Sequence, residues 1–117
     1  SPDQPLARDE VFGPILAVLT VSSFDEALKI ANDTTYGLAA SIFTANGRAA
    51  LRAAREVKAG TVTINCYGEG DVTTPFGGYK QSGFGGRDNG IHAHDQYTEL
   101  KTIWINLEDP KDGDALD

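Results

Sequence analysis

The chain has 117 residues, of which 40% are hydrophobic and 23% are charged, and its net charge is −7. These values fit one globular domain and argue against a disordered chain, while the acidic excess argues against a nucleic-acid partner. The longest apolar stretch, 15–21, is too short to cross a bilayer, and the start of the chain shows no apolar leader. A single cysteine, Cys66, rules out an internal disulfide, so a cytoplasmic location is expected.

Three apolar stretches alternate with two helical patterns along the first half of the chain. The predicted elements are a strand at 15–21, a helix within 22–33, a strand at 38–44, a helix at 48–57 and a strand at 61–65. The first helix has a capping box, with Ser23 as N-cap and Glu26 three residues later. The order βαβαβ predicts an α/β fold with a parallel sheet and helices on its faces.

A glycine-rich segment, 66–90, follows the third predicted strand and contains eight glycines. Its aromatic residues favour burial and argue against a flexible linker. The dinucleotide fingerprint Gly-x-Gly-x-x-Gly fails, because its third position falls on Thr73 or Asp88, and no Gly-Lys-Ser/Thr follows. The sequence therefore predicts a rigid loop, whose glycines allow close approach to a ligand or a neighbouring domain.

The last third of the chain is expected to hold a short helix at 91–97 and a final strand at 100–106. The residues 108–117 contain five carboxylates and one lysine, which predicts a solvated, disordered tail. His92 and His94 are two residues apart and would lie on nearly opposite sides of a helix. This spacing favours exposed histidines, and no metal site is assigned.

Five stretches of the sequence resemble, in order, the C-terminal part of NAD(P)-dependent aldehyde dehydrogenases. They are "DEVFGP" (9–14), "ANDTTYGLAASIFT" (31–44), "AGTVTINCY" (59–67), "PFGGYKQSGFGGRD" (75–88) and "YTELKTIWI" (97–105). Three further features, "GEGD", "HAHDQYTELKTIW" and the doubled glycine at 85–86, look most similar to the branch that oxidises amino-aldehydes such as gamma-glutamyl-gamma-aminobutyraldehyde. The extra glycine shifts the alignment of Arg87, which is therefore given no role.

The resemblance implies a division of the chain into three parts. Residues 1–98 would be the C-terminal part of the catalytic domain, with the βαβαβ segment and the glycine-rich loop. Residues 99–107 would be a bridging strand through which the parent enzyme forms a homodimer or homotetramer, followed by the acidic tail at 108–117. The parent reaction would be oxidation of an aldehyde to a carboxylic acid by cysteine attack, hydride transfer to NAD+ or NADP+, and thioester hydrolysis.

The resemblance also implies that the reactive centre is not contained in this chain. The family's nucleophilic cysteine and its Rossmann-like domain lie upstream of the matched region, and Cys66 matches a non-catalytic position. No catalytic residue is therefore assigned, and the 117-residue chain alone is expected to be inactive and not to bind the cofactor.

Three residues receive site roles from the resemblance, and a fourth, Glu69, receives one from a departure from the family pattern. Glu10 matches the glutamate that holds the nicotinamide ribose, since a carboxylate can accept hydrogen bonds from vicinal hydroxyls. Phe12 matches the phenylalanine beside the nicotinamide, and Phe76 matches the aromatic that walls the aldehyde channel. Glu69, together with Asp71, stands where many members carry bulky residues and is expected to attract a cationic amine. The structural alternatives are a surface acid for Glu10, core packing for Phe12, burial of the glycine-rich loop for Phe76, and exposed carboxylates on a turn for Glu69 and Asp71.

A second class of function stays open from the sequence. The chain could be a stand-alone α/β interaction module whose glycine-rich loop and edge strand bind a protein partner without chemistry.

Overall fold

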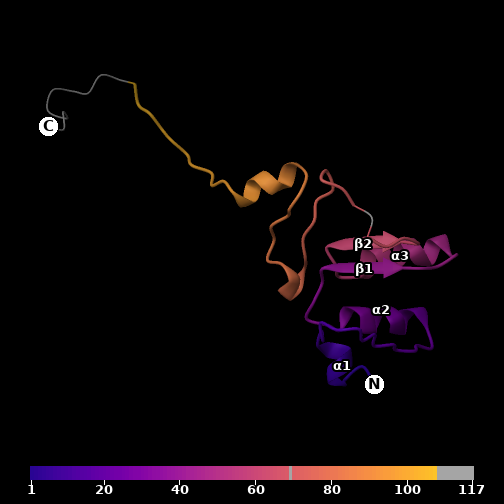
Figure 1. Ribbon diagram of the computed structural model, residues 1–117. Coiled ribbons are helices and arrows are strands. Elements are labelled where there is room, and N and C mark those ends of the chain that lie inside the picture. Colours follow the sequence, from indigo (N-terminus) through magenta and orange to yellow (C-terminus); the bar gives the residue numbers. More distant parts are fainter. Residues whose placement is uncertain (69, 108–117) are drawn as a thin grey trace.

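The computed structural model describes residues 1–68 and 70–107. In chain order the elements are α1 Pro5–Arg8, α2 Phe24–Asn32, β1 Ala39–Ile42, α3 Gly47–Glu56, β2 Thr61–Ile64 and two 3-10 helices, η1 Lys80–Ser82 and η2 Ile91–Gln96. Strands β1 and β2 pair in parallel, with Ala39 opposite Thr61 and Ile42 opposite Ile64, and α3 packs against both (Figure 1). This βαβ unit confirms an α/β fold with a parallel sheet.

Both longer helices begin at side chains that cap free backbone N–H groups. In α2 the Ser23 hydroxyl accepts a hydrogen bond from the Glu26 amide at 3.1 Å. The Glu26 carboxylate in turn accepts from the amide and hydroxyl of Ser22, at 2.8 and 2.6 Å, so the predicted capping box forms with its return bonds one residue earlier. In α3 the Asn46 side chain accepts from the amides of Arg48 and Ala49, the second and third helical residues, at 3.0 and 3.1 Å.

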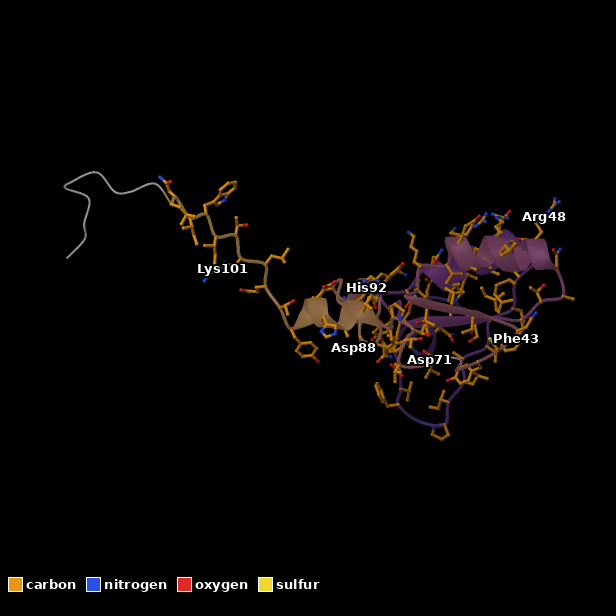
Figure 2. The ribbon with its side chains drawn as sticks, turned by 90° about the horizontal axis from the view of Figure 1, so that it is seen from above. Phe43, Arg48, Asp71, Asp88, His92 and Lys101 are labelled. Atoms are coloured by element: carbon orange, nitrogen blue, oxygen red, sulfur yellow. The ribbon has the colours of Figure 1, made fainter. Side chains whose placement is uncertain are left out.

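The hydrophobic core of the described residues is small. It consists of Leu28 from α2, Ala50 and Ala53 from α3, and Ala59 just before β2. Large apolar side chains lie outside it, among them Trp104 at 92% exposure. Figure 2 shows the C-terminal segment with Lys101 leading away from the βαβ unit, and the radius of gyration is 23.3 Å against about 13 Å for a compact domain of this length. Exposed apolar faces of this extent mark surfaces that pack against other protein.

Two of the predicted strands are wrong. Residues 15–21 form no strand, and six of the seven are exposed. Residues 100–106 are likewise not in a strand, and the helix expected at 91–97 is the 3-10 helix η2. An apolar run predicts burial, but a strand forms only where a second strand pairs with it, and the part of the chain that the structure describes supplies none here. The predicted tail, 108–117, lies outside the described residues.

The glycine-rich loop is folded onto the βαβ unit by backbone hydrogen bonds. The amide of Tyr79 donates to the Gly37 carbonyl at 2.8 Å, and the amide of Gln81 donates to the Thr35 carbonyl at 3.0 Å. Farther along, Phe76 and Asp88 exchange amide-to-carbonyl bonds of 2.8 and 2.7 Å in an antiparallel bridge. This segment is therefore an ordered part of the fold and not a linker.

One close approach in this loop predicts a strong effect on stability. A Cβ added at Gly60 would overlap the backbone carbonyl of Gly77, whereas one added at Gly47, at the start of α3, would meet nothing within 4 Å. We expect Gly60→Ala to destabilise the protein by about 1–3 kcal/mol, because the two backbones must separate. Gly47→Ala is the matched control and should be neutral or stabilising by less than about 1 kcal/mol. Urea unfolding of both variants measures the difference, and equal stabilities would contradict the close packing.

Candidate functional site

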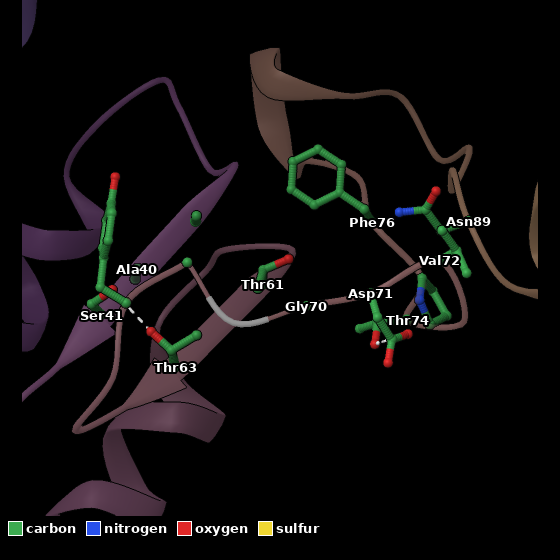
Figure 3. Close-up of a pocket in the computed structure, with 14 residues that line it drawn as sticks. Ala40, Ser41, Thr61, Thr63, Gly70, Asp71, Val72, Thr74, Phe76 and Asn89 are labelled. Atoms are coloured by element: carbon green, nitrogen blue, oxygen red, sulfur yellow. Dashed lines mark hydrogen bonds between the residues drawn. The ribbon is translucent and has the colours of Figure 1, made fainter.

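A cavity of about 460 Å³ lies between the two-stranded sheet and the glycine-rich loop (Figure 3). Its strand side includes Ser41 and Thr63, whose hydroxyls are joined by a hydrogen bond of 2.9 Å. Its loop side includes Asp71, Val72 and Phe76, and the Phe76 ring extends toward the sheet. This volume lies within the range of small-molecule sites, and the lining combines apolar groups with a few polar ones.

Phe76 is held at this cavity by pairing across the loop. Its backbone is bridged to Asp88. The Gln96 side-chain amide holds residues 87 and 88 in place by donating to the Arg87 carbonyl at 2.7 Å and to Asp88 Oδ1 at 2.9 Å. Phe76 is 43% exposed and lines the cavity. Sequence reasoning missed Gln96, because no local pattern links it to a residue eight positions earlier.

Asp71 forms a tight turn at the loop side of the same cavity. Its Oδ1 accepts hydrogen bonds from the Thr73 amide at 2.7 Å, from the Thr73 hydroxyl at 2.6 Å and from the Thr74 hydroxyl at 3.3 Å. The Thr73 hydroxyl bond, followed by the Thr73 amide bond, lowers the pKa of Asp71 below its ordinary value. The cavity therefore carries a negative charge at neutral pH. Glu69, the other acid expected here, lies outside the described residues.

Glu10 lines a second cavity, of about 600 Å³, which shares residues 39–41 of β1 with the first. The Glu10 side chain is exposed and forms no hydrogen bond or ion pair within residues 1–68 and 70–107. Phe12, two residues later, is 90% exposed and has φ of 53°, a backbone conformation that is uncommon for a bulky residue. The structure thus places Glu10 and Phe76 at different cavities that have one strand in common.

Two cationic side chains, those of Arg8 and Lys80, bind acceptors at the C-terminal end of α2. Arg8 donates to the carbonyl of Asp33 and, at 2.8 Å, to its Oδ2, and the same guanidinium reaches Asp3 Oδ1 at 3.1 Å. The pKa of Asp33 is lowered by its hydrogen bond to Arg8. Lys80 Nζ donates to the carbonyls of Asn32 and Thr34, both at 2.9 Å. Sequence reasoning missed this arrangement, because the contacting residues are 25 to 48 positions apart.

Other reactive groups in the described part of the chain offer little to a site. Cys66 is half-buried, and its carbonyl accepts a hydrogen bond from the Thr63 hydroxyl at 2.9 Å. His92 and His94 are exposed, and within the described residues no group of three or more His, Cys, Asp or Glu side chains could hold a metal ion. No helix among these residues is long and apolar enough to cross a membrane.

Comparison with known proteins identifies one family. The model of the aldehyde dehydrogenase family matches residues 1–103. Aminoacetaldehyde dehydrogenase of Pseudomonas aeruginosa is 63% identical over 106 residues, and NADP/NAD-dependent aldehyde dehydrogenase PuuC of Escherichia coli is 52% identical over 107. These alignments cover 91% and 92% of this chain but only 21% of each relative.

A solved structure gives the same result. The chain superposes on indole-3-acetaldehyde dehydrogenase AldA of P. syringae in complex with NAD+ and IAA with a TM-score of 0.84 and 53% sequence identity. That superposition covers 92% of this chain and 21% of the other. The chain therefore spans about one fifth of the length of the relatives that it matches, and it belongs to the aldehyde dehydrogenase family.

Proposed function

We propose that the full-length protein oxidises an aldehyde to a carboxylic acid with NAD+ or NADP+ as the hydride acceptor. The observation that carries the proposal is the family match over residues 1–103, which contain both cavities. Relatives include an aldehyde dehydrogenase described as NADP/NAD-dependent and a structural neighbour in complex with NAD+. Family membership favours this enzyme over the alternative, a stand-alone interaction module.

The residues near the amino end fit the nicotinamide side of such a cofactor. Glu10 lines a cavity with a carboxylate that is engaged with no other described residue, so both of its oxygens can accept hydrogen bonds from vicinal ribose hydroxyls. Phe12 presents an exposed ring two residues away, which could limit the positions of a flat ring next to it. The bound nicotinamide would supply the hydride acceptor, and Glu10 and Phe12 would hold and orient it.

The cavity at the glycine-rich loop fits the substrate side. Phe76 and Val72 supply apolar wall, which would keep water from the aldehyde until it has reacted. The attacking thiol would come from another part of the protein, because Cys66 lines neither cavity and matches a non-catalytic position in the resemblance. The described chain would therefore bind and orient both reactants, while the bond-making nucleophile comes from outside it.

An amino-aldehyde is the substrate class that the charges of this cavity favour. Asp71 lines the cavity and, as an exposed aspartate, is ionised at neutral pH, so it would attract a cationic amine. Glu69, two residues earlier, would add a second negative charge. The aminoacetaldehyde dehydrogenase relative supports this class, although the indole-3-acetaldehyde dehydrogenase neighbour is described by an uncharged substrate. The two acids, Asp71 and Glu69, are thus the specific support for a substrate that carries an amine.

The full-length protein would assemble into an oligomer through its C-terminal segment, residues 99–107. Ile103 and Trp104 are exposed at 70% and 92% in the extended residues 99–107, and such a segment is available to extend a sheet of a partner subunit. The proposal therefore includes assembly into a homodimer or homotetramer through this segment. It also includes a location in the cytoplasm.

The cofactor role of Glu10 predicts a selective kinetic defect. In the full-length protein Glu10→Gln should raise the KM for NAD+ by about tenfold, because charge-assisted hydrogen bonds to the ribose hydroxyls are lost. The KM for the aldehyde should change little. Asp25→Asn, which also removes one exposed carboxylate, is the matched control. NADH formation followed by absorbance gives both constants, and an unaltered KM for NAD+ would remove this role.

The charge of the cavity predicts an amine preference that can be removed. Asp71→Asn keeps the Oδ1 acceptor of the turn but loses the negative charge, so the ratio of kcat/KM for amino-aldehydes to that for plain aldehydes should fall by about threefold or more. Glu69→Gln should act in the same direction. Steady-state kinetics with propanal and 3-aminopropanal measure the ratio. If neither variant lowers it, the proposed substrate class is wrong.

The lowered pKa of Asp71 predicts a pH-dependent stability difference. Because the folded pKa lies below the unfolded value of about 3.9, this carboxylate stabilises the folded state above that value, and the effect is lost as the pH falls through the folded pKa. Thr73→Val removes the hydroxyl that lowers the pKa most. The difference in stability between wild type and Thr73→Val should therefore be larger at pH 7 than at pH 3. Urea unfolding at both pH values tests this, and a pH-independent difference would contradict it.

A further inference from the structure

We infer that the C-terminal end of α2, residues 32–34, sets the proposed cofactor contact and the proposed substrate contact relative to each other, with Lys80 as the positioning residue of the substrate loop. This inference rests on the proposed function. It assigns Lys80 and Arg8 a part in the reaction although neither lines the cavity that holds Phe76.

Lys80 is bound where a helix leaves its last carbonyl groups without partners. Its ammonium donates to the carbonyl of Asn32, the last residue of α2, and to that of Thr34, each at 2.9 Å. A cation at this end also interacts favourably with the helix dipole. The backbone of Lys80 has φ of 52°, which is costly for a residue with a side chain, so the surrounding contacts must hold it there.

The backbone on both sides of Lys80 is fixed to the same region. The preceding residue, Tyr79, donates to the Gly37 carbonyl at 2.8 Å, and the following residue, Gln81, donates to the Thr35 carbonyl at 3.0 Å. The amide of Gly37 donates to the hydroxyl of Ser82 at 3.0 Å. Phe76 is only four residues before Lys80, so this attachment acts on the position of its ring together with the bridge to Asp88.

Arg8 attaches the amino-terminal segment to the same end of α2. It binds both the carbonyl and the carboxylate of Asp33, which lies between the two residues that Lys80 contacts. Glu10 is two residues after Arg8. Glu10 and Phe76 line different cavities. The segment of each is nevertheless attached to residues 32–34, through Arg8 for Glu10 and through Lys80 for Phe76.

The anchor itself is tied to the βαβ unit. The side chain of Asn32 donates to the Glu56 carbonyl at the end of α3, at 2.8 Å, and accepts from the Lys58 amide at 2.7 Å. Residues 32–34 therefore cannot shift without disturbing the connection between α3 and β2. A displacement of about 1 Å between reacting groups can lower the rate by up to about a hundredfold, so a change at residues 32–34 should lower the catalytic rate.

The test uses three variants of the full-length protein, each with a methionine in place of a cation. Lys80→Met should lower kcat/KM for the aldehyde by about tenfold or more and leave the KM for NAD+ within about twofold. Arg8→Met should raise the KM for NAD+ and affect the aldehyde less. Lys29→Met is the control, because this exposed lysine on the last turn of α2 donates no hydrogen bond within the described residues.

Hydrogen exchange provides a readout that does not need activity. In Lys80→Met the amides of residues 79–83 should exchange faster, while those of α2 that lie before the anchor stay protected. Unchanged exchange at 79–83 overturns the inference, as does an unchanged aldehyde kcat/KM or an equal change in both substrates' constants. If Lys80→Met does not fold, Lys80→Gln is read in the same way.

The failure of the proposed function would look different. It would appear as a wild-type protein that forms no NADH with any aldehyde, and the inference would then fall with it. An active wild type whose Lys80 variants behave like Lys29→Met would leave the proposed function intact and would remove only the role of the anchor.

Discussion

The carbonyl of Gly37 is the acceptor on which the arrangement of the whole chain depends. It receives the Gly60 amide at 3.0 Å and the Tyr79 amide at 2.8 Å, so one oxygen joins the entry to β1, the entry to β2 and the glycine-rich loop. Gly37 is buried, and a Cβ there would come within 2.6 Å of the Lys58 carbonyl. A side chain at this point would separate the three segments, and the cavity between sheet and loop would lose its shape.

Polar contacts carry so much of this organisation because the apolar core is small. Among residues 1–68 and 70–107, four apolar residues are buried, and three of them are alanines, which contribute little area each. The ion pairs of Arg52 are exposed and add little on their own, whereas Arg8 adds a bond to the Asp33 carbonyl to its ion pair with that residue. Backbone bonds and side-chain bonds to carbonyls, as at Asn32 and Lys80, therefore fix the geometry, while the exposed apolar faces depend on further protein for their burial.

Local signals in the sequence predicted the elements that are determined locally. The capping box at Ser23 predicted α2, and the alanine-rich pattern at 48–57 predicted α3, because these signals lie within one or two turns of the helix. The strand at 15–21 was predicted from an apolar run and the strand at 100–106 from an alternating pattern; neither forms within the described chain, because strand formation depends on a pairing partner that these segments do not encode. The roles of Glu10 and Phe76 came from family resemblance and stay predictions.

The same limit explains why the anchor at the end of α2 had no signal in the sequence. Lys80 contacts residues 46 and 48 positions earlier, and Arg8 contacts Asp33 25 positions later, so no periodicity connects them. What the sequence does contain is the requirement for close backbone approach, in the glycines on either side of Lys80. Gly78, before the lysine, packs against Ser82, and Gly83, after it, packs against the Gly78 backbone, so the chain turns tightly around Lys80.

Strand β1 alone could not fix the position of the two cavities relative to each other. It has four residues and a single described neighbour, β2, yet it forms a wall of both cavities. The groups that would contact the two reactants come from segments outside the strand, one before α2 and one after β2. Their separation is therefore set by what attaches those segments to each other, and in this structure the side-chain attachments made by Arg8 and Lys80 are both to residues 32–34. A protein that transfers a hydride between two bound molecules needs that separation to be constant, which is why we place the controlling contact at the helix end and not at the sheet.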